Sequence, residues 1–223
     1  MTISLLRMPI SARGLLASAL SIFMGLALAG CDDADELNVG DLIKRAEQSV
    51  KAGDLRSASV DLKTILQKDP NSVDARLMLG KLYLDIGDAD SARKELEIAA
   101  SLGADAIETN FLIGRSYLLG GDYSTILKDY VVTDQMPASE ISNGSLVRGR
   151  ALLEQRKRDE SELEFQKAAS AYKTDIEIDR PHLKHTNPPE RLDAVVGLAN
   201  VSIYKEDWEK AQKWLDQAIA LSP

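Results

Sequence analysis

The chain has 223 residues, of which 44% are hydrophobic, 28% charged and only 5% aromatic. That length suffices for one medium domain or for a repeat array without a single centre, and few aromatic residues with abundant alanine and leucine favour helices over sheets. The formal net charge of −8 makes nucleic acid and anionic membrane surfaces poor direct partners.

Residues 1–30 have the pattern of a secretory signal peptide. Arg7 and Arg13 form a positive start, and a 17-residue apolar stretch runs from Gly14 to Gly30, as signal peptides require. The alternative is a membrane-spanning anchor, for which 17 residues are at the lower limit. Small residues in the stretch and the chain's single cysteine at its end favour cleavage, which would leave a net charge of −10.

The residues around that cysteine carry a family resemblance. Leu28-Ala29-Gly30-Cys31 resembles the lipobox of bacterial lipoproteins at all four positions. The resemblance implies that Cys31 is lipidated and becomes the mature N-terminus, so that the lipid alone contacts the membrane. A buried or free thiol is the alternative.

Residues 31–38 are expected to form an acidic linker. In that linker Asp32 resembles the signal that retains lipoproteins at the inner membrane of enteric bacteria. We therefore expect attachment on the periplasmic side in a Gram-negative bacterium, at the inner rather than the outer membrane.

The rest of the chain repeats with a period of 34 residues. Gly53, Gly87 and Gly121 share that spacing, and an aspartate follows each of them. Glycine can take the left-handed conformation that ends a helix, and the aspartate can cap the next helix. Apolar residues at three- and four-residue intervals indicate amphipathic helices. The pattern predicts an all-α array of about five antiparallel helix hairpins.

The repeat resembles the tetratricopeptide (TPR) family. The second repeat carries the Leu-Gly-x-x-Tyr motif from Leu79 to Tyr83, followed by Gly87, Ala92 and Leu96. Small residues at Gly80 and Ala92 would let two helices approach closely. By this resemblance repeats one to four occupy 39–172 and repeat five occupies 192–223, and in repeat four Arg156 replaces the turn glycine.

A proline-containing insertion, residues 173–191, separates the last two repeats. It is expected to be a loop that could include a helical turn, because its three prolines forbid a long uninterrupted helix. It holds both histidines, His182 and His185. The pair could bind a metal, but no third ligand pattern accompanies it, so solvated histidines and no metal site are expected. The chain also lacks a glycine-rich phosphate loop, Gly-x-Ser-x-Gly and His-Glu-x-x-His. We therefore expect no enzyme activity, no catalytic residue and no cofactor.

The TPR resemblance implies that the first helix of each hairpin lines a concave groove. Its apolar positions would flank a central row that is basic in repeats two to four. Some apolar members could instead pack between neighbouring hairpins. The groove suits a protein partner that is extended or helical, apolar and acidic. The expected groove residues are Lys81, Arg115, Arg150, Leu77, Leu84, Phe111, Leu118, Leu146 and Leu153.

A lipobox joined to TPRs narrows the functional hypotheses. The LAGCD start, the stretch from Gln48 to Asp105 and the stretch from Val195 to Pro223 resemble the TPR lipoprotein of the PEP-CTERM/exosortase system. Its members usually have more repeats, so the resemblance implies a shortened member. It also implies a periplasmic scaffold for exopolysaccharide or surface-protein export. The alternatives are a pilotin-like lipoprotein for assembly of a type IV pilus secretin, and an accessory subunit of an envelope enzyme complex.

Overall fold

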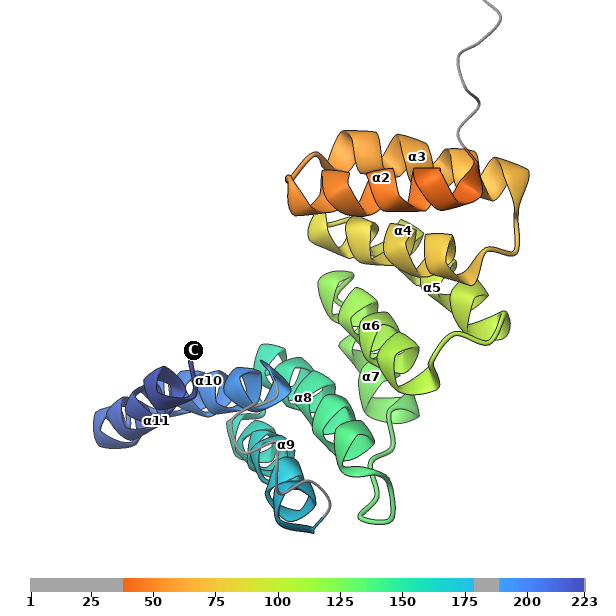
Figure 1. The fold of residues 1–223 in the computed structure, drawn as a ribbon. Helices are drawn as coiled ribbons and strands as arrows, with labels where there is room; N and C mark the ends of the chain where they lie inside the picture. Colours follow the sequence, from red (N-terminus) through yellow and green to blue (C-terminus); the bar gives the residue numbers. More distant parts are fainter. Residues whose placement is uncertain (1–37, 179–188, 223) are drawn as a thin grey trace, which may run out of the picture. The chain divides into compact units, whose positions relative to one another are not determined.

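The computed structural model describes residues 38–178 and 189–222, which are helical with no strand among them (Figure 1). The expected all-α array of five helix hairpins is confirmed. The hairpins are α2 (Val39–Lys51) with α3 (Leu55–Lys68), α4 (Val73–Asp85) with α5 (Ala89–Ser101), α6 (Ala106–Leu119) with α7 (Tyr123–Asp129), α8 (Ala138–Glu154) with α9 (Arg158–Ile178), and α10 (Pro189–Tyr204) with α11 (Trp208–Leu221).

The chain divides into two units, residues 1–41 and 42–223. Of the first unit the structure describes Asn38 to Asp41. There the Asn38 side-chain oxygen accepts a hydrogen bond of 3.0 Å from the Asp41 N–H. This bond caps the start of α2.

All five hairpin turns close in the same way. After α2, the Gly53 N–H donates to the Val50 carbonyl at 3.0 Å, and the Asp54 N–H donates to the Ser49 carbonyl at 2.8 Å. This pair of bonds is the Schellman motif, which satisfies free carbonyls at a helix end. The other four turns repeat it. Gly53 has φ +75°, as the motif requires.

Two of the turns place a residue other than glycine in the left-handed conformation. Arg156 has φ +61° and Glu206 has φ +59°. The turn geometry of the repeat is therefore kept where its glycine is lost, although a side chain at positive φ carries a steric cost.

Aspartate side chains cap the second helices as the sequence predicts. Asp54, Asp88 and Asp122 each accept a hydrogen bond from the backbone N–H three residues later. Hydrogen bonds from Ser57, Ser91 and Thr125 respectively lower the pKa of these three carboxyls, because the bonds favour the charged form.

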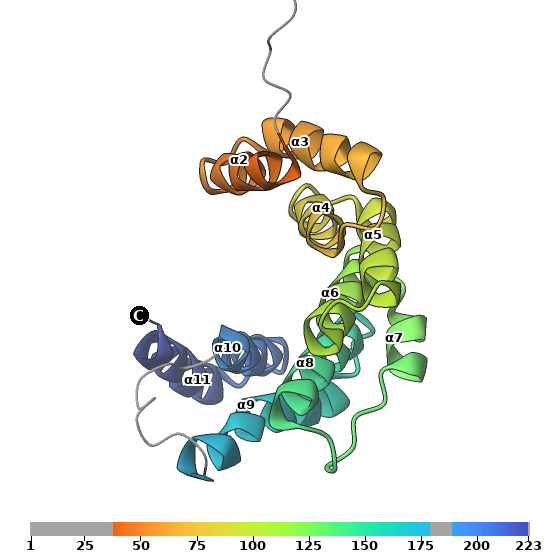
Figure 2. The same cartoon turned by 45° about the vertical axis from the view of Figure 1, so that its right-hand side comes forward.

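The hairpins are held together by close helix contacts at glycine. A Cβ atom on Gly80 of α4 would lie 2.6 Å from Cγ of Leu96 on α5, so only glycine allows this approach. Consecutive hairpins also pack on one another: α5 contacts α6, α6 contacts α8, and α10 contacts both α8 and α9 (Figures 1 and 2). Buried leucine, isoleucine, valine and alanine side chains fill these contacts.

Arginine–carboxylate pairs add polar links within three hairpins. Arg45 of α2 donates two hydrogen bonds, of 2.8 and 2.6 Å, to the nearly buried Asp61 of α3. Arg76 of α4 contacts Glu95 of α5 at 2.5 Å. In the fourth hairpin Arg148 pairs with Glu164 at 2.7 Å. Such bonds are stronger than neutral ones and fix the pairing of the two helices.

The third hairpin departs from the pattern because α7 has only seven residues, against 14 in α3 and 13 in α5. The chain leaves the helix at Tyr130 and re-enters one at Ala138. Arg148 of α8 supports this exit by donating to the carbonyls of Leu127 and Tyr130 at 3.1 and 2.9 Å. Residues 130–137, which join α7 to α8, are referred to below as the 130–137 segment.

Helices extend into the stretch 173–191 that the sequence suggested to be a loop. α9 continues to Ile178, and α10 begins at Pro189. Proline fits the first turn of a helix, where its missing N–H has no partner to lose. Residues 179–188 lie outside the described part of the chain, as do residues 1–37. The predictions about Cys31, Asp32, His182 and His185 therefore concern residues that the structure does not describe.

Candidate functional site

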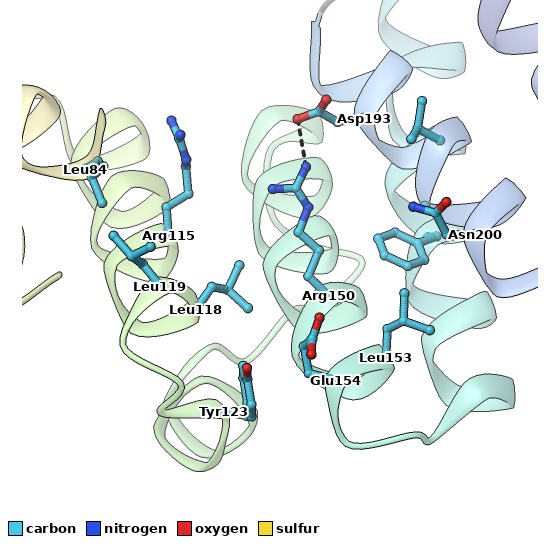
Figure 3. A pocket seen from close by; sticks show the side chains of 13 residues that line it. Leu84, Arg115, Leu118, Leu119, Tyr123, Arg150, Leu153, Glu154, Asp193 and Asn200 are labelled. Carbon is cyan, nitrogen blue, oxygen red and sulfur yellow. Dashed lines mark hydrogen bonds and ion pairs between the residues drawn. The ribbon is translucent and has the colours of Figure 1, made fainter. Parts of the chain in front are cut away.

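A cleft of about 470 Å³ opens between the first helices of the later hairpins (Figure 3). One wall comes from α6 and the end of α4, and the other comes from α8 and α10. The floor is mainly apolar, and four charged side chains lie among the leucines. The cleft is lined by Leu84, Arg115, Leu118, Leu119, Tyr123, Arg150, Leu153, Glu154, Phe165, Asp193, Val196, Gly197 and Asn200.

Five of the nine residues expected to form the groove line this cleft. They are Leu84, Arg115, Leu118, Arg150 and Leu153. They come from α4, α6 and α8, at positions that recur once per hairpin. Because α6 and α8 pack against each other, these recurring positions meet on one surface.

Three other expected groove residues pack in or against the core, which is the alternative that the sequence left open for the apolar positions. Leu146 is fully buried in a cluster with Phe165 and Leu198. Phe111 packs against this cluster and a neighbouring one, and Leu77 packs against the core of the second hairpin. Since they occupy the same position of their repeats, that position serves contact between adjacent hairpins. Leu146 has no exposed surface to offer a partner.

Two of the three cations of the expected basic row form ion pairs. Lys81 lies outside the cleft and pairs with Glu108 of α6 at 2.6 Å. Arg150 pairs with Asp193 of α10 at 3.1 Å, and both side chains remain about half exposed (Figure 3). Arg115 forms no ion pair with any residue in the described ranges 38–178 and 189–222.

The cleft therefore contains one cation without a described counter-ion. Arg115 and Arg150 are balanced in number by Glu154 and Asp193, so the cleft as a whole is not strongly basic. Arg115 is the cation of the expected row that has no ion pair among the described residues, and Lys81 and Arg150 remain partly exposed within their pairs.

Several lining residues were not expected from the sequence. Tyr123 and Phe165 come from second helices, which the repeat pattern assigns to the outer layer. Phe165 reaches inward because its ring lies between two glycines: a Cβ on Gly149 would be 2.9 Å from the ring, and one on Gly197 would be 2.5 Å from it. The sequence signal that could have predicted this placement of Phe165 was a pair of glycines, one on α8 and one on α10, that face an aromatic residue. Asp193 gave no such signal, because its partner is 43 positions away.

The described residues offer binding surface rather than an arrangement of reactive groups. Within ranges 38–178 and 189–222, no group of three or more histidine, cysteine or acidic side chains is placed to hold a metal ion. No helix in that same part of the chain is long and apolar enough to cross a membrane.

Comparison with known proteins agrees with this architecture. Residues 49–108 match the model of the tetratricopeptide repeat family. A crystal structure of MamA protein is similar at 17% identity and a TM-score of 0.54, over 82% of this chain and 91% of that one. A second MamA structure is similar at 18% identity and a TM-score of 0.51, over 79% and 93%. No curated protein matches the chain by sequence.

At these identities the structural likeness shows the fold. Residues 49–108 match the TPR repeat, and the fold of the described residues is a TPR-like solenoid of helical hairpins. TPR folds are typical of protein–protein interaction scaffolds, and an array of this kind presents extended concave surfaces to partners.

Proposed function

We propose that this protein is a scaffold that binds a segment of a partner protein in the cleft. The observation that carries the proposal is the cleft itself: an open concavity of about 470 Å³ with a mainly apolar floor and an arginine, Arg115, that forms no ion pair with any described residue. A mainly apolar concavity with a few placed polar groups is the usual form of a binding site.

The composition of the cleft defines the partner segment. Leu118 is half-buried, and Leu119 and Val196 are exposed, so apolar side chains of a partner would bury them further. Arg115 would pair with one carboxylate of that segment, because a charge-assisted bond is stronger where apolar walls exclude water. The partner is thus an apolar segment with at least one acidic residue.

Co-purification tests this proposal. The full chain carrying an affinity tag is isolated from detergent-solubilised membranes, and its bound proteins are identified and titrated back. Arg115→Glu should weaken binding of the recovered partner by about tenfold or more, since a hydrogen bond to a charged group contributes roughly 1.5–3 kcal/mol.

The matched control is Lys94→Glu, the same charge reversal at an exposed site on α5. It should leave binding unchanged. Equal affinity of the wild type and Arg115→Glu, at low and high salt alike, would show that the partner does not use the cleft.

The N-terminal sequence supports a lipid-anchored location on the periplasmic side of the membrane. The support is the four-residue lipobox that ends at Cys31. Mass spectrometry of the mature N-terminus should find an acylated Cys31, and Cys31→Ser should release the protein from membranes. Asp32 supports the inner membrane, so Asp32→Ser should move the protein outward in membrane fractionation. An unchanged membrane association of Cys31→Ser would refute the anchor.

The resemblance to PEP-CTERM/exosortase lipoproteins supports a role in envelope export. We propose that the bound partner belongs to machinery for exopolysaccharide or surface-protein export. Deleting the gene should reduce secreted polysaccharide, and the wild-type gene should restore it. Normal secretion together with a loss of assembled pilus secretin would favour the pilotin-like role instead.

A further inference from the structure

The 130–137 segment creates a second pocket, separate from the cleft. Where α3 and α5 continue for about two more turns, α7 stops at Asp129. The space beside α6 and α8 that a longer α7 would occupy is partly filled by Tyr130, which contacts α6, and by Val132, which contacts α8. A pocket of about 390 Å³ remains between α6, the end of α7, the 130–137 segment and the start of α8.

The pocket and the cleft lie on opposite sides of α6. Asn110, Ile113 and Tyr117 line the pocket, whereas Arg115 and Leu118 line the cleft. With 3.6 residues per turn, the first set projects from the helix roughly opposite the second. A ligand in one site therefore leaves the other accessible.

Contacts from α8 and α9 hold the walls of the pocket in place. Arg148 donates to the carbonyl of Tyr130 at 2.9 Å, and Lys167 of α9 contacts Asp134 at 3.1 Å. The Tyr130 hydroxyl donates to the carbonyl of Asn110 at 2.9 Å. Val132 lies so close to α8 that a Cβ on Gly144 would be 2.7 Å from its Cγ2. The pocket is thus a built feature of the third and fourth hairpins.

The pocket combines an apolar and aromatic lining with negative charge. Ile113, Val132 and Met136 supply apolar surface, and Tyr117 and Tyr130 supply two rings. Its charged lining residues are Asp129 and Glu140, both acids. The cations next to the pocket are each paired with an acid: Arg148 with Glu164, Lys167 with Asp134, and Arg93 with Asp90. Lys128 approaches Asp129 only to 4.0 Å and is highly exposed.

We propose that this pocket binds an arginine or lysine side chain from a basic segment of a second partner protein. The long apolar stem of such a side chain matches the pocket walls. Its charged end matches Asp129 and Glu140, and aromatic rings attract cations. The Arg93 guanidinium lies 5.1 Å from the ring centre of Tyr117, which is the geometry of such a contact. Two sites of opposite preference on one helix would let the scaffold hold two partners together.

Fluorescence polarisation with a defined probe tests the inference. The probe is a fluorescein-labelled peptide, Ala-Leu-Arg-Leu-Ala with blocked ends. Its control replaces arginine by citrulline, which has nearly the same shape without the charge. The full chain in detergent should bind the arginine peptide at least about fivefold more tightly. Equal binding of the two peptides, or no binding of the arginine peptide, overturns the proposal.

Substitutions then locate the site. Asp129→Asn with Glu140→Gln should weaken arginine-peptide binding by about five- to tenfold, as expected when two partly exposed charge pairs are lost. The control, Asp85→Asn with Glu160→Gln, removes the same charge at exposed positions elsewhere and should bind like the wild type.

The cleft variant Arg115→Glu should also bind this peptide normally, which separates the pocket from the proposed function. If the pocket double variant binds as tightly as the control double variant, the pocket is not the site. Circular dichroism confirms that each variant keeps its helix content.

Discussion

The packing of the last two hairpins can be tested by adding one carbon atom next to the ring of Phe165. It is 1% exposed and lies between α8 and α10. In Gly197→Ala the new Cβ would be 2.5, 2.6 and 2.7 Å from three ring carbons, whereas carbon atoms normally pack at about 3.5–4.0 Å. The ring would have to retreat by about 1 Å toward Gly149, where the space is equally limited.

The magnitude follows from two opposing effects. Overpacking a core costs about 1–3 kcal/mol, and replacing glycine by alanine in a helix recovers about 0.5–1 kcal/mol. We expect a net loss of up to about 2.5 kcal/mol in the free energy of unfolding, with a central value of about 1 kcal/mol, measured by urea titration with circular dichroism. The control is Gly120→Ala, because Gly120 has φ −78° and its nearest contacts would be ordinary, at 3.4 and 3.5 Å.

A double-mutant cycle identifies the ring as the cause. In a Phe165→Leu background the obstruction is reduced, so Gly197→Ala should cost much less than in the wild type. The coupling between the two substitutions should be about 1 kcal/mol, as for residues in contact. Equal urea midpoints for Gly197→Ala and Gly120→Ala, or no coupling in the cycle, would refute this account of the packing.

Three further predictions concern the turns, the caps and the 130–137 segment. Arg156→Gly should raise the free energy of unfolding by about 1 kcal/mol, because it removes a side chain at φ +61°; a lower urea midpoint would contradict the assigned turn. Replacing Asp54, Asp88 and Asp122 together by asparagine should flatten the acid side of the stability profile. Hydrogen bonding depresses the folded pKa of these groups, so their contribution is full above the unfolded pKa of about 3.9 and is lost as pH falls through the folded pKa. Thermal melts of the triple variant and the wild type at pH 6 and pH 3 measure this contribution. If both proteins lose the same stability between these pH values, the three aspartates do not contribute to it. Arg148→Met should lower the free energy of unfolding by about 3 kcal/mol or more, since it leaves Glu164 and two carbonyls without their donor. The control is Lys128→Met at an exposed position, and equal losses in the two variants would show that Arg148 does not hold the 130–137 segment in place.

The helix pairing could be predicted from the sequence because its signals are local. A glycine followed by aspartate specifies a turn and a cap within a few residues, and the 34-residue spacing repeats that signal at Gly53, Gly87 and Gly121. The fifth turn has the same bonds with Glu206 in place of glycine. Because the insertion before it breaks the 34-residue period, this hairpin is predicted from other repeat residues, Ala199 and Ala211 among them. The early end of α7 gave no comparable signal, because Arg148 supports it from a different hairpin.

The cleft could be predicted only in part, since its details depend on contacts between hairpins. Repeat positions identified Leu84, Arg115 and Leu118, which project from consecutive first helices. They could not distinguish surface from core at Leu146, because burial there depends on how closely α9 and α10 approach. The pairing of Lys81 with Glu108, 27 positions apart, likewise depends on the stacking of two hairpins.

The local closure of the hairpin turns also bears on how quickly the chain folds. Each turn is completed by bonds between residues no more than five positions apart, and closing so short a loop costs little chain entropy. An array whose spatial neighbours are also neighbours in sequence can begin folding at any hairpin and should do so rapidly. Longer separations occur where the fifth hairpin meets the fourth, because Arg150 and Asp193 are 43 positions apart. Docking of the fifth hairpin onto the fourth is therefore expected to be the late event in refolding, and substitutions at Phe165, which is buried at this junction, should change the unfolding rate more than the folding rate.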